Sequence, residues 1–321
     1  MSNFASGYIK YINNLEQIND AAVSNPLKMI TEVEDSYRDH LEDVARNIRA
    51  HHDKIKICML AGPSSSGKTT TAHLLQTYLR NFGVNAYIVS MDNFYLGREN
   101  TPKTPEGKPD YETVNSLDLE KIRTTLAEAA CSGIIRIPHF DFGVSHAVGE
   151  DTVIDLKDDD MIIMEGLHAL NPMFTKGIPS DKLIKLYVSV KQDLEDINGE
   201  VIHASDIRLV RRIVRDMKYR GSDAEETILM WDDVVAGEDK YIRPYRLSAD
   251  YTVNSIHIYE PCVLRIPAIP VLRKIEENSP AYRKARELDS KLMRFEPIAT
   301  QLVPSKSMLR EFLGPKYDLD K

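Results

Sequence analysis

The sequence predicts an α/β protein, built on a parallel sheet with helices on both faces and helical additions at the N- and C-terminal ends. Three observations support this prediction. Short apolar runs typical of buried strands alternate with segments of helical periodicity. A loop rich in glycine and serine lies between the first strand and the first helix of this alternation. After about residue 259, helical segments divided by prolines replace the alternation.

The composition indicates a folded protein with a sizeable core. Of 321 residues, 42% are hydrophobic, and 49 acidic against 41 basic side chains give a net charge of −8. This charge has the wrong sign for a protein that wraps nucleic acid, so no nucleic-acid partner is expected. No apolar run approaches the ~20 residues of a membrane span, and the first residues do not resemble a signal peptide. We therefore expect no membrane contact and a cytoplasmic location.

The cysteines and histidines do not indicate a resident metal. Cys58, Cys131 and Cys262 are odd in number and lack C-x-x-C spacing, which argues against a disulfide framework and a zinc site. The nine histidines show neither H-E-x-x-H nor zinc-finger spacing. A metal ion used by this protein is thus expected to arrive with a substrate.

We divide the chain into an N-terminal helical extension (residues 1–52), a core (53–258) and a C-terminal helical appendage (259–321). Apolar residues at steps of three and four predict one long amphipathic helix over residues 26–51. Seven prolines separate the helical pieces of the appendage, such as residues 282–294. The appendage either packs on the sheet or forms a contact between copies in a homo-oligomer, and the sequence leaves both open.

The core alternates predicted strands and helices. The predicted strands cover residues 55–61, 86–90, 161–164 and 183–190, and the predicted helices cover residues 68–82, 117–131 and 205–219. Sheets of this kind bind ligands beyond the carboxyl ends of their strands. Functional residues are therefore expected at those ends.

The segment Gly62–Thr69 matches the phosphate-loop pattern G-x-x-x-x-G-K-[ST] and lies between a strand and a helix. Its two glycines permit a tight turn that points backbone N–H groups at phosphate oxygens, and Lys68 brings a positive charge. Thr69 offers a hydroxyl group to Mg²⁺. The alternative is a Ser/Gly turn that only caps a helix, but the strand–loop–helix context favours a P-loop NTPase-type sheet that binds a nucleoside triphosphate. The candidate nucleotide-binding residues of this segment are Gly62, Ser64, Ser65, Ser66, Gly67, Lys68, Thr69 and Thr70.

A carboxylate follows the apolar run at residues 161–164. Glu165 stands where an acidic group next to the phosphate loop could hold Mg²⁺ or its water shell. We therefore assign Thr69 and Glu165 as candidate metal ligands. The alternative is that Glu165 only caps the turn that follows the strand.

The acceptor of the phosphoryl group must be inferred from residues outside the phosphate loop. The guanine-reading pattern N-K-x-D is absent, which argues against a GTPase. Asp92 follows the second predicted strand, where it could accept a proton from an attacking hydroxyl group. Asp92 is thus the candidate base of a small-molecule kinase, and the alternative is an aspartate that only forms a turn.

A loop rich in turn formers covers residues 101–112. Asp110 could accept hydrogen bonds from two adjacent sugar hydroxyls, and Tyr111 could lie along the face of a ring. The alternative is a solvent-exposed connection without a binding role.

Arginines recur along the predicted helix over residues 205–219. Arg208, Arg212 and Arg215 share one helical face, and like charges at this spacing destabilise a helix unless an anion binds there. A triphosphate fits that anion, and the segment near residues 205–221 would then close over ATP as a lid that excludes water. The alternative is a solvated basic face paired with acidic neighbours, namely Asp206, Asp216 and Asp223.

Together these motifs resemble the phosphoribulokinase/uridine kinase family over about residues 55–255, and most closely the bacterial uridine kinase-like proteins. The resemblance rests on Gly62–Thr69, Ser90–Tyr95, Pro109–Glu112, Ile137–Phe142, Glu165–Gly166 and Arg208–Gly221, which occur in this order. The bacterial relatives also share Met230-Trp231, Gly237-Glu238 and a tail like Val303–Phe312.

The resemblance implies ATP-dependent phosphorylation of a nucleoside 5′-hydroxyl, with Asp92 as base and Asp110 on the ribose. It also implies that the segment from Phe140 to His146 forms part of the base pocket. The candidate catalytic residues are then Asp92, Lys68 and Arg215, and Arg212 and Arg215 join the ATP site. The candidate acceptor-binding residues are Asp92, Tyr95, Asp110, Tyr111, Phe140, His146, Arg212 and Arg220.

The sequence departs from the uridine–cytidine kinase pattern at three positions. Phe140 stands where those kinases carry Tyr, Met230 stands where they carry Gln, and His146 aligns only through a one-residue gap. A site that lacks hydrogen-bond partners for the base discriminates poorly between acceptors. Two alternatives therefore stay open, a kinase of another hydroxylated metabolite such as ribulose 5-phosphate or pantothenate, and a non-catalytic ATP-binding regulatory protein.

Overall fold

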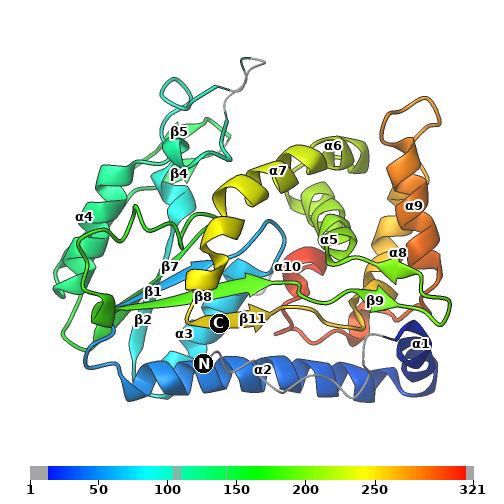
Figure 1. Ribbon diagram of the computed structural model, residues 1–321, viewed down its shortest axis with the longest axis horizontal. Helices are drawn as coiled ribbons and strands as arrows, with labels where there is room; N and C mark the ends of the chain where they lie inside the picture. The colour runs from blue at the N-terminus through cyan, green and yellow to red at the C-terminus, as the bar shows by residue number, and fades with distance from the viewer. Residues whose placement is uncertain (1–13, 104–106, 108–109, 142, 316–321) are drawn as a thin grey trace.

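The computed structural model describes residues 14–103, 107, 110–141 and 143–315. It contains a central sheet of five parallel strands, which confirms the predicted α/β fold (Figure 1). The strands, in spatial order, are β11 (Tyr251–Asn254), β8 (Leu183–Ser189), β1 (Ile57–Ala61), β7 (Asp160–Glu165) and β2 (Asn85–Ser90). Strands β1 and β7 are buried along their whole length because helices cover both faces of the sheet.

Alternate residues of β1 face two different cores. Cys58 and Leu60 pack in the larger core, and Ile57, Met59 and Ala61 pack in the smaller one. The larger core is built with α2 (Pro26–Ala50), α3 (Lys68–Asn81), α5 (Ala204–Tyr219) and α8 (Glu260–Leu272), and the smaller one with α4 (Leu119–Ala130). The period-two alternation of a strand thus joins both layers of helices to one sheet.

The N-terminal helices pack on the core. Asn14 caps the N-terminus of α1 (Leu15–Ser24), and Asn25 caps that of α2, where its side chain accepts a hydrogen bond from the Lys28 N–H. The helix predicted over residues 26–51 is confirmed as α2, which runs along the lower edge in Figure 1. Its Tyr37 hydroxyl lies 2.6 Å from the Thr71 hydroxyl of α3, so the extension contacts the helix that follows the phosphate loop.

The C-terminal segment belongs to the larger core as well. Its helices are α9 (Tyr282–Met293) and the short α10 (Arg310–Leu313), which follow α8. Met308, Leu309 and Phe312 are fully buried in the core that α3 and α5 also share. This part of the chain therefore packs against the helices that carry the phosphate loop and the arginines.

Several short elements lack a clear pattern in the sequence. They are β3 (Ile134–Ile137) with β6 (Thr152–Asp155), β4 (Phe140–Asp141) with β5 (His146–Ala147), and β9 (Leu194–Glu195) with β10 (Val201–Ile202). Helices α6 (Ala224–Leu229) and α7 (Trp231–Tyr241) follow α5. Strands of two to four residues are stabilised by their partners rather than by their own composition, and this explains why the sequence did not reveal them.

Helix α5 covers most of the segment that the sequence predicted as a lid over ATP. Ten of its sixteen residues are buried, and it packs against α6, α8 and α10. The helix thus supports its arginines from inside the fold. Among the helices of the described residues, none combines the length and the apolar composition of a membrane-spanning segment.

Candidate active site

The phosphate loop connects β1 to α3 at the carboxyl edge of the sheet. A side chain at Gly62 would overlap the Val188 carbonyl oxygen of the neighbouring strand. Gly67 has φ +86°, and Ser65 also has a positive φ, of +55°. Gly67 therefore supplies the left-handed turn at which the loop enters the helix, and Gly62 supplies the close approach to β8.

The groups of this loop fit a phosphate ligand. Ser65 and Ser66 are buried, and within the described part of the chain neither hydroxyl group has a hydrogen-bond partner. Lys68 donates a hydrogen bond to the Pro63 carbonyl oxygen at 3.2 Å, so its ammonium group lies over the loop. Thr69 is exposed at the beginning of α3. A buried hydroxyl group without a hydrogen-bond partner destabilises the fold unless a ligand supplies that partner. The two serine hydroxyls therefore favour the binding of phosphate oxygens in this loop.

Ser64 is held by two elements distant in the sequence. Its backbone N–H donates to Glu238 of α7 at 2.7 Å, and Glu238 also forms an ion pair with Arg208 of α5. Arg208 donates to the Ser64 carbonyl oxygen at 2.9 Å, and Arg212 donates to the Ser64 hydroxyl at 3.0 Å. The arginine helix thus contacts the phosphate loop directly.

Two candidate carboxylates lie at neighbouring strand ends. The β2–β7 pairing sets Ser90 opposite Glu165, and Asp92 follows two residues later in the short helix η1 (Met91–Phe94). Burial, together with the negative charge of Asp92, raises the pKa of Glu165, while Lys68 opposes the shift. The Asp92 residue is exposed to solvent. The protein packed round its carboxyl group nevertheless raises its pKa, although the positive charges of Lys68 and Arg220 act in the opposite direction. Both carboxyl groups are thus close to the phosphate-loop lysine.

The oxygen groups at this edge suit a magnesium ion carried by a nucleotide. In the described ranges no three His, Cys, Asp or Glu side chains are grouped to hold a metal by themselves. Mg²⁺ commonly binds through one or two carboxylates together with substrate phosphates and water. The exposed Thr69 hydroxyl and the buried Glu165 carboxylate would complete such a sphere when a nucleotide brings the ion.

Three of the predicted arginines converge on one carboxylate. Asp216 lies 3.2 Å from Arg212, 2.7 Å from Arg215 and 3.6 Å from Arg220. Asp216 is buried, whereas Arg220 is exposed. Part of the pairing with acidic neighbours that the sequence left open is therefore present, and it keeps the arginines close to each other beside the phosphate loop.

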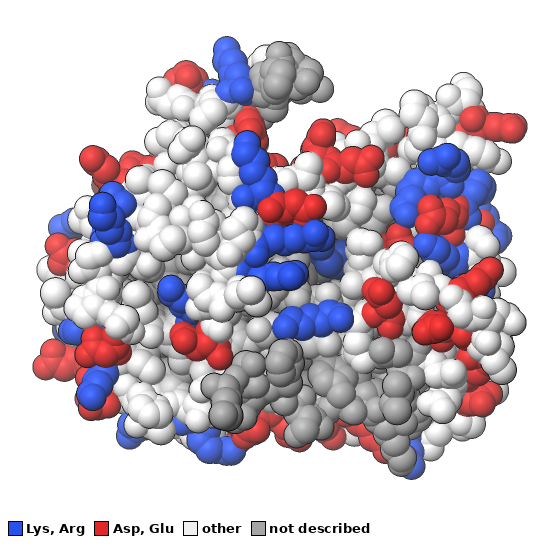
Figure 2. All heavy atoms as spheres, in the orientation of Figure 1, with Lys and Arg blue, Asp and Glu red and all other residues white. Residues whose placement is uncertain are grey.

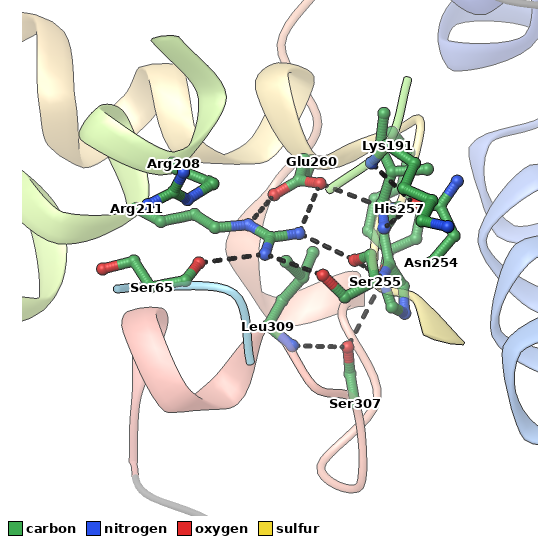
Figure 3. Close-up of polar contacts among 12 residues, drawn as sticks. Ser65, Lys191, Arg208, Arg211, Asn254, Ser255, His257, Glu260, Ser307 and Leu309 are labelled. Atoms are coloured by element: carbon green, nitrogen blue, oxygen red, sulfur yellow. Dashed lines mark hydrogen bonds and ion pairs between the residues drawn. The ribbon is translucent and has the colours of Figure 1, made fainter. Parts of the chain in front are cut away.

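Arg211 has a structural role that the helical pattern could not reveal. It is fully buried, pairs with Glu260 and donates to the Ser65 carbonyl oxygen at 3.2 Å (Figure 3). It also donates to the Ser255 carbonyl oxygen at 2.8 Å. Arg211 therefore ties α5, α8 and the phosphate loop together.

The predicted acceptor side gathers three aromatic rings. The centroids of Tyr95 and Tyr111 lie 5.5 Å apart in an edge-on arrangement, and Tyr95 and Phe140 lie 5.7 Å apart. The Tyr95 hydroxyl donates to the Tyr111 carbonyl oxygen at 3.1 Å. Asp110 accepts a hydrogen bond from the Glu112 N–H at 3.0 Å, which fixes the turn that carries it. Residues 104–106 and 108–109 of this loop lie outside the described residues.

The more distant predicted residues are less closely joined to this cluster. His146 is exposed on β5, pairs in register with Asp141, and its Nδ1 lies 2.9 Å from the Val144 carbonyl oxygen. Phe142, between them, lies outside the described residues. Met230 precedes α7 and is 46% exposed. The rings of Tyr95, Tyr111 and Phe140 are thus assembled, and no described contact joins His146 to them.

His168 belongs to none of the motifs from which site residues were predicted. It lies three residues after Glu165, is almost fully buried and contacts Tyr241 edge-on at 5.7 Å between ring centroids. Burial lowers the pKa of His168 to about 4, although the negative charge of the nearby Asp110 acts to raise it. The imidazole is therefore neutral near pH 7. Its position just beyond a central strand was the signal that could have revealed it.

A groove adjoins the phosphate loop on the β8 side. It is a cavity of about 590 Å³ that Pro63, Lys191, Arg243 and Arg246 help to line. Figure 2 shows Lys and Arg side chains gathered near the centre of this face, and the surface is also hollowed between the side with β4 and β5 and the side with α6 and α7. The basic patch is therefore local in a chain of net charge −8.

Comparison with known proteins agrees with this geometry. A model of the "Phosphoribulokinase / Uridine kinase family" matches residues 57–259, more than half of the chain. A "Uridine kinase" of Lactobacillus helveticus is 30% identical over 202 residues, covering 63% of this chain and 87% of the relative. A "Uridine kinase" of Ureaplasma parvum is 24% identical over 198 residues, covering 61% and 86%.

A solved structure, described as a possible uridine kinase from Bacillus stearothermophilus, is 18% identical with a TM-score of 0.44. It covers 67% of this chain and 97% of that one. The family match itself includes the phosphate loop, both strand-end carboxylates and the arginine helix. The chain therefore belongs to the phosphoribulokinase/uridine kinase family.

Proposed function

We propose that this protein is an ATP-dependent kinase that transfers the γ-phosphoryl group to the 5′-hydroxyl of a nucleoside of the uridine or cytidine type. The observation that carries this proposal is the position of Asp92. Its carboxyl group follows β2 and interacts electrostatically with Lys68 of the phosphate loop and with Arg220. A carboxylate there can orient an acceptor hydroxyl group and take its proton as the phosphoryl group moves.

The residues divide into a donor side and an acceptor side. On the donor side the phosphate loop, Lys68, Arg212 and Arg215 would bind ATP, and Thr69 with Glu165 would hold Mg²⁺. The bound ion would neutralise charge that develops on the phosphates. On the acceptor side Asp110 would bind the ribose hydroxyls, and the rings of Tyr95, Tyr111 and Phe140 would contact the nucleoside. Arg220 would lie between the two sides, close to Asp92.

The charge of the acceptor side favours a neutral acceptor. Burial raises the pKa of Glu112, Arg212 and Lys68 oppose this shift, and the nearby carboxyl groups of Glu238 and Asp110 add to it. Asp92 and Glu165 add two further carboxyl groups. These carboxyl groups would oppose the binding of a phosphorylated sugar or a carboxylic acid unless an arginine compensates its charge, whereas a nucleoside carries no charge. This supports a nucleoside over ribulose 5-phosphate and pantothenate, which are anions.

A panel of acceptors tests the proposal. The purified protein is incubated with MgATP and, in separate reactions, uridine, cytidine, ribulose 5-phosphate or pantothenate, and ADP release is measured. We expect ADP only with a nucleoside, and little without an acceptor. ADP release with an anionic acceptor alone would replace the nucleoside by that metabolite. ATP binding without ADP release for any acceptor would indicate a regulatory nucleotide-binding protein.

A further inference from the structure

We propose that Glu311, in the C-terminal segment, occupies a phosphate position of the nucleotide site and thereby sets the affinity of the phosphate loop for ATP. The inference rests on the proposed binding of ATP at this loop. Glu311 Oε2 accepts a hydrogen bond from the Thr70 hydroxyl at 2.8 Å and lies 3.4 Å from the Thr70 backbone nitrogen. Its carboxylate is thus bound to the first turn of α3.

The first turn of α3 is where a phosphate would bind. Helix α3 begins at Lys68, so the N–H group of Thr70 is one of those that have no acceptor within the helix. Phosphate loops use these N–H groups and the positive end of the helix to bind phosphate oxygens. A carboxylate on the same N–H and hydroxyl groups occupies the place of an anionic ligand, and both cannot be bound at once.

A second contact places the same segment over the loop. The Met308 sulfur lies 2.6 Å from the position that a Cβ atom of Gly67 would have, and Met308 is fully buried. The segment therefore approaches the loop at two points, on Gly67 at the turn and on Thr70 in the helix. Glu311 also contributes to raising the pKa of Glu165, which agrees with a position close to the site.

The backbone of the segment is firmly attached, whereas the Glu311 side chain is not enclosed. The Phe312 ring packs under the Arg211 guanidinium at 5.2 Å, and Lys218 donates to the Leu313 carbonyl oxygen at 2.5 Å. Glu311 itself is only half-buried. A rotation of its side chain could therefore free the Thr70 groups while the hydrophobic anchors stay in place.

The expected effect follows from the fraction of time that Glu311 occupies the position. If the carboxylate is bound to Thr70 about nine-tenths of the time, only about one-tenth of the protein molecules can bind ATP at any moment. The apparent affinity is proportional to this fraction, so removal of the carboxylate should strengthen ATP binding about tenfold. If Glu311 only caps α3, its removal should destabilise the protein and leave the affinity for ATP unchanged.

The test is calorimetric titration of the full chain with MgATP in the absence of any acceptor. Glu311→Gln removes the charge and keeps the shape, so the variant should fold. Glu311→Asp keeps the charge but is one methylene shorter and so should reach Thr70 poorly. Glu287→Gln makes the same change on α9, where the carboxylate pairs with Lys291, and serves as the control.

We expect Glu311→Gln to bind ATP about tenfold more tightly than the unaltered protein, Glu311→Asp to change in the same direction, and Glu287→Gln to be unchanged. Equal affinity in all four proteins, weaker binding by Glu311→Gln, or no ATP binding by any of them would overturn the proposal. Since no acceptor is present, a failure of the nucleoside assignment would show only in the acceptor panel and would leave this result intact.

Discussion

Arg211 and Glu260 form an ion pair from which solvent is fully excluded. Both side chains have zero exposure, and two hydrogen bonds of 2.5 and 2.8 Å join the guanidinium group to the carboxylate (Figure 3). The pair connects α5 to α8, and through the Ser65 carbonyl oxygen it reaches the phosphate loop. The position of the phosphate loop therefore depends on the buried Arg211–Glu260 ion pair.

Removing one partner should destabilise the fold. Glu260→Gln leaves the buried guanidinium of Arg211 without its counter-charge, and we expect the free energy of unfolding to fall by about 3–5 kcal/mol. Urea denaturation followed by circular dichroism measures this change. Replacing both partners with methionine should be less harmful than Glu260→Gln, because no uncompensated charge stays buried. A loss below about 1 kcal/mol for Glu260→Gln would show that the pair does not maintain the fold.

Replacing the proposed base should separate binding from chemistry. We expect Asp92→Asn to bind ATP as the unaltered protein does and to lose about two to four orders of magnitude in kcat, because the amide cannot accept the proton. Lys68→Ala should weaken both ATP binding and turnover. Calorimetric titration and an ADP-release assay measure the two effects. Normal turnover in Asp92→Asn would remove Asp92 from the mechanism.

The acidic limb of the pH profile of kcat/KM, where activity falls as the pH decreases, should lie at a higher pH than the ordinary pKa of an aspartate. The protein packed round the Asp92 carboxyl group raises its pKa, and the base acts only when deprotonated, so kcat/KM should fall as the pH drops through this raised value. Arg220→Gln removes a positive charge that lowers the pKa of Asp92, so the limb should move to higher pH. Glu287→Gln should leave the limb in place.

The position of the limb, rather than the absolute rate, is the quantity to compare, since Arg220 is also a proposed acceptor-binding residue. A limb that stays at the same pH in Arg220→Gln would mean that the charge of Arg220 does not act on Asp92. A limb near pH 4 in the unaltered protein would mean that Asp92 has an ordinary pKa.

The aromatic cluster should affect the acceptor and not the donor. Tyr111 contacts Tyr95 edge-on, and we expect Tyr111→Ala to raise the KM for the nucleoside about tenfold, as the loss of ~1–2 kcal/mol of ring contact would. The KM for ATP should stay the same. Tyr111→Phe keeps the ring and should behave nearly like the unaltered protein. An equal rise of both KM values would indicate a general distortion of the site.

Local patterns in the sequence predicted the sheet, its longer helices and the phosphate loop. The spacing of Gly62, Gly67 and Lys68 between a strand and a helix is a local signal, because loops of this pattern bind phosphate mostly with their own backbone. The strand-end positions of Asp92 and Glu165 were also predictable, since parallel strands align their carboxyl ends at one edge. The short strands were not, because their stability depends on partners 5 to 21 residues away.

The arginine helix shows the limit of a one-dimensional pattern. Helical spacing grouped Arg208, Arg212 and Arg215 on one face, with Arg211 beside them, and any of them could have faced a nucleotide. In the structure Arg211 pairs with Glu260, Arg208 with Glu238, and Arg212 and Arg215 with Asp216. Arg208 and Arg211 are thus held by carboxylates of other helices, whereas Arg212 and Arg215 share a carboxylate of their own helix, a division that helical spacing does not reveal.

The sequence alone thus determined the fold class, the nucleotide loop and the carboxylates at the strand ends, because each depends on residues close together in the chain. Only the tertiary structure decided that His168 is buried and that Glu238 and Glu311 contact Ser64 and Thr70. Their partners Ser64 and Thr70 are 174 and 241 residues away. Contacts over such separations arise from packing of the whole core, and no local periodicity encodes them.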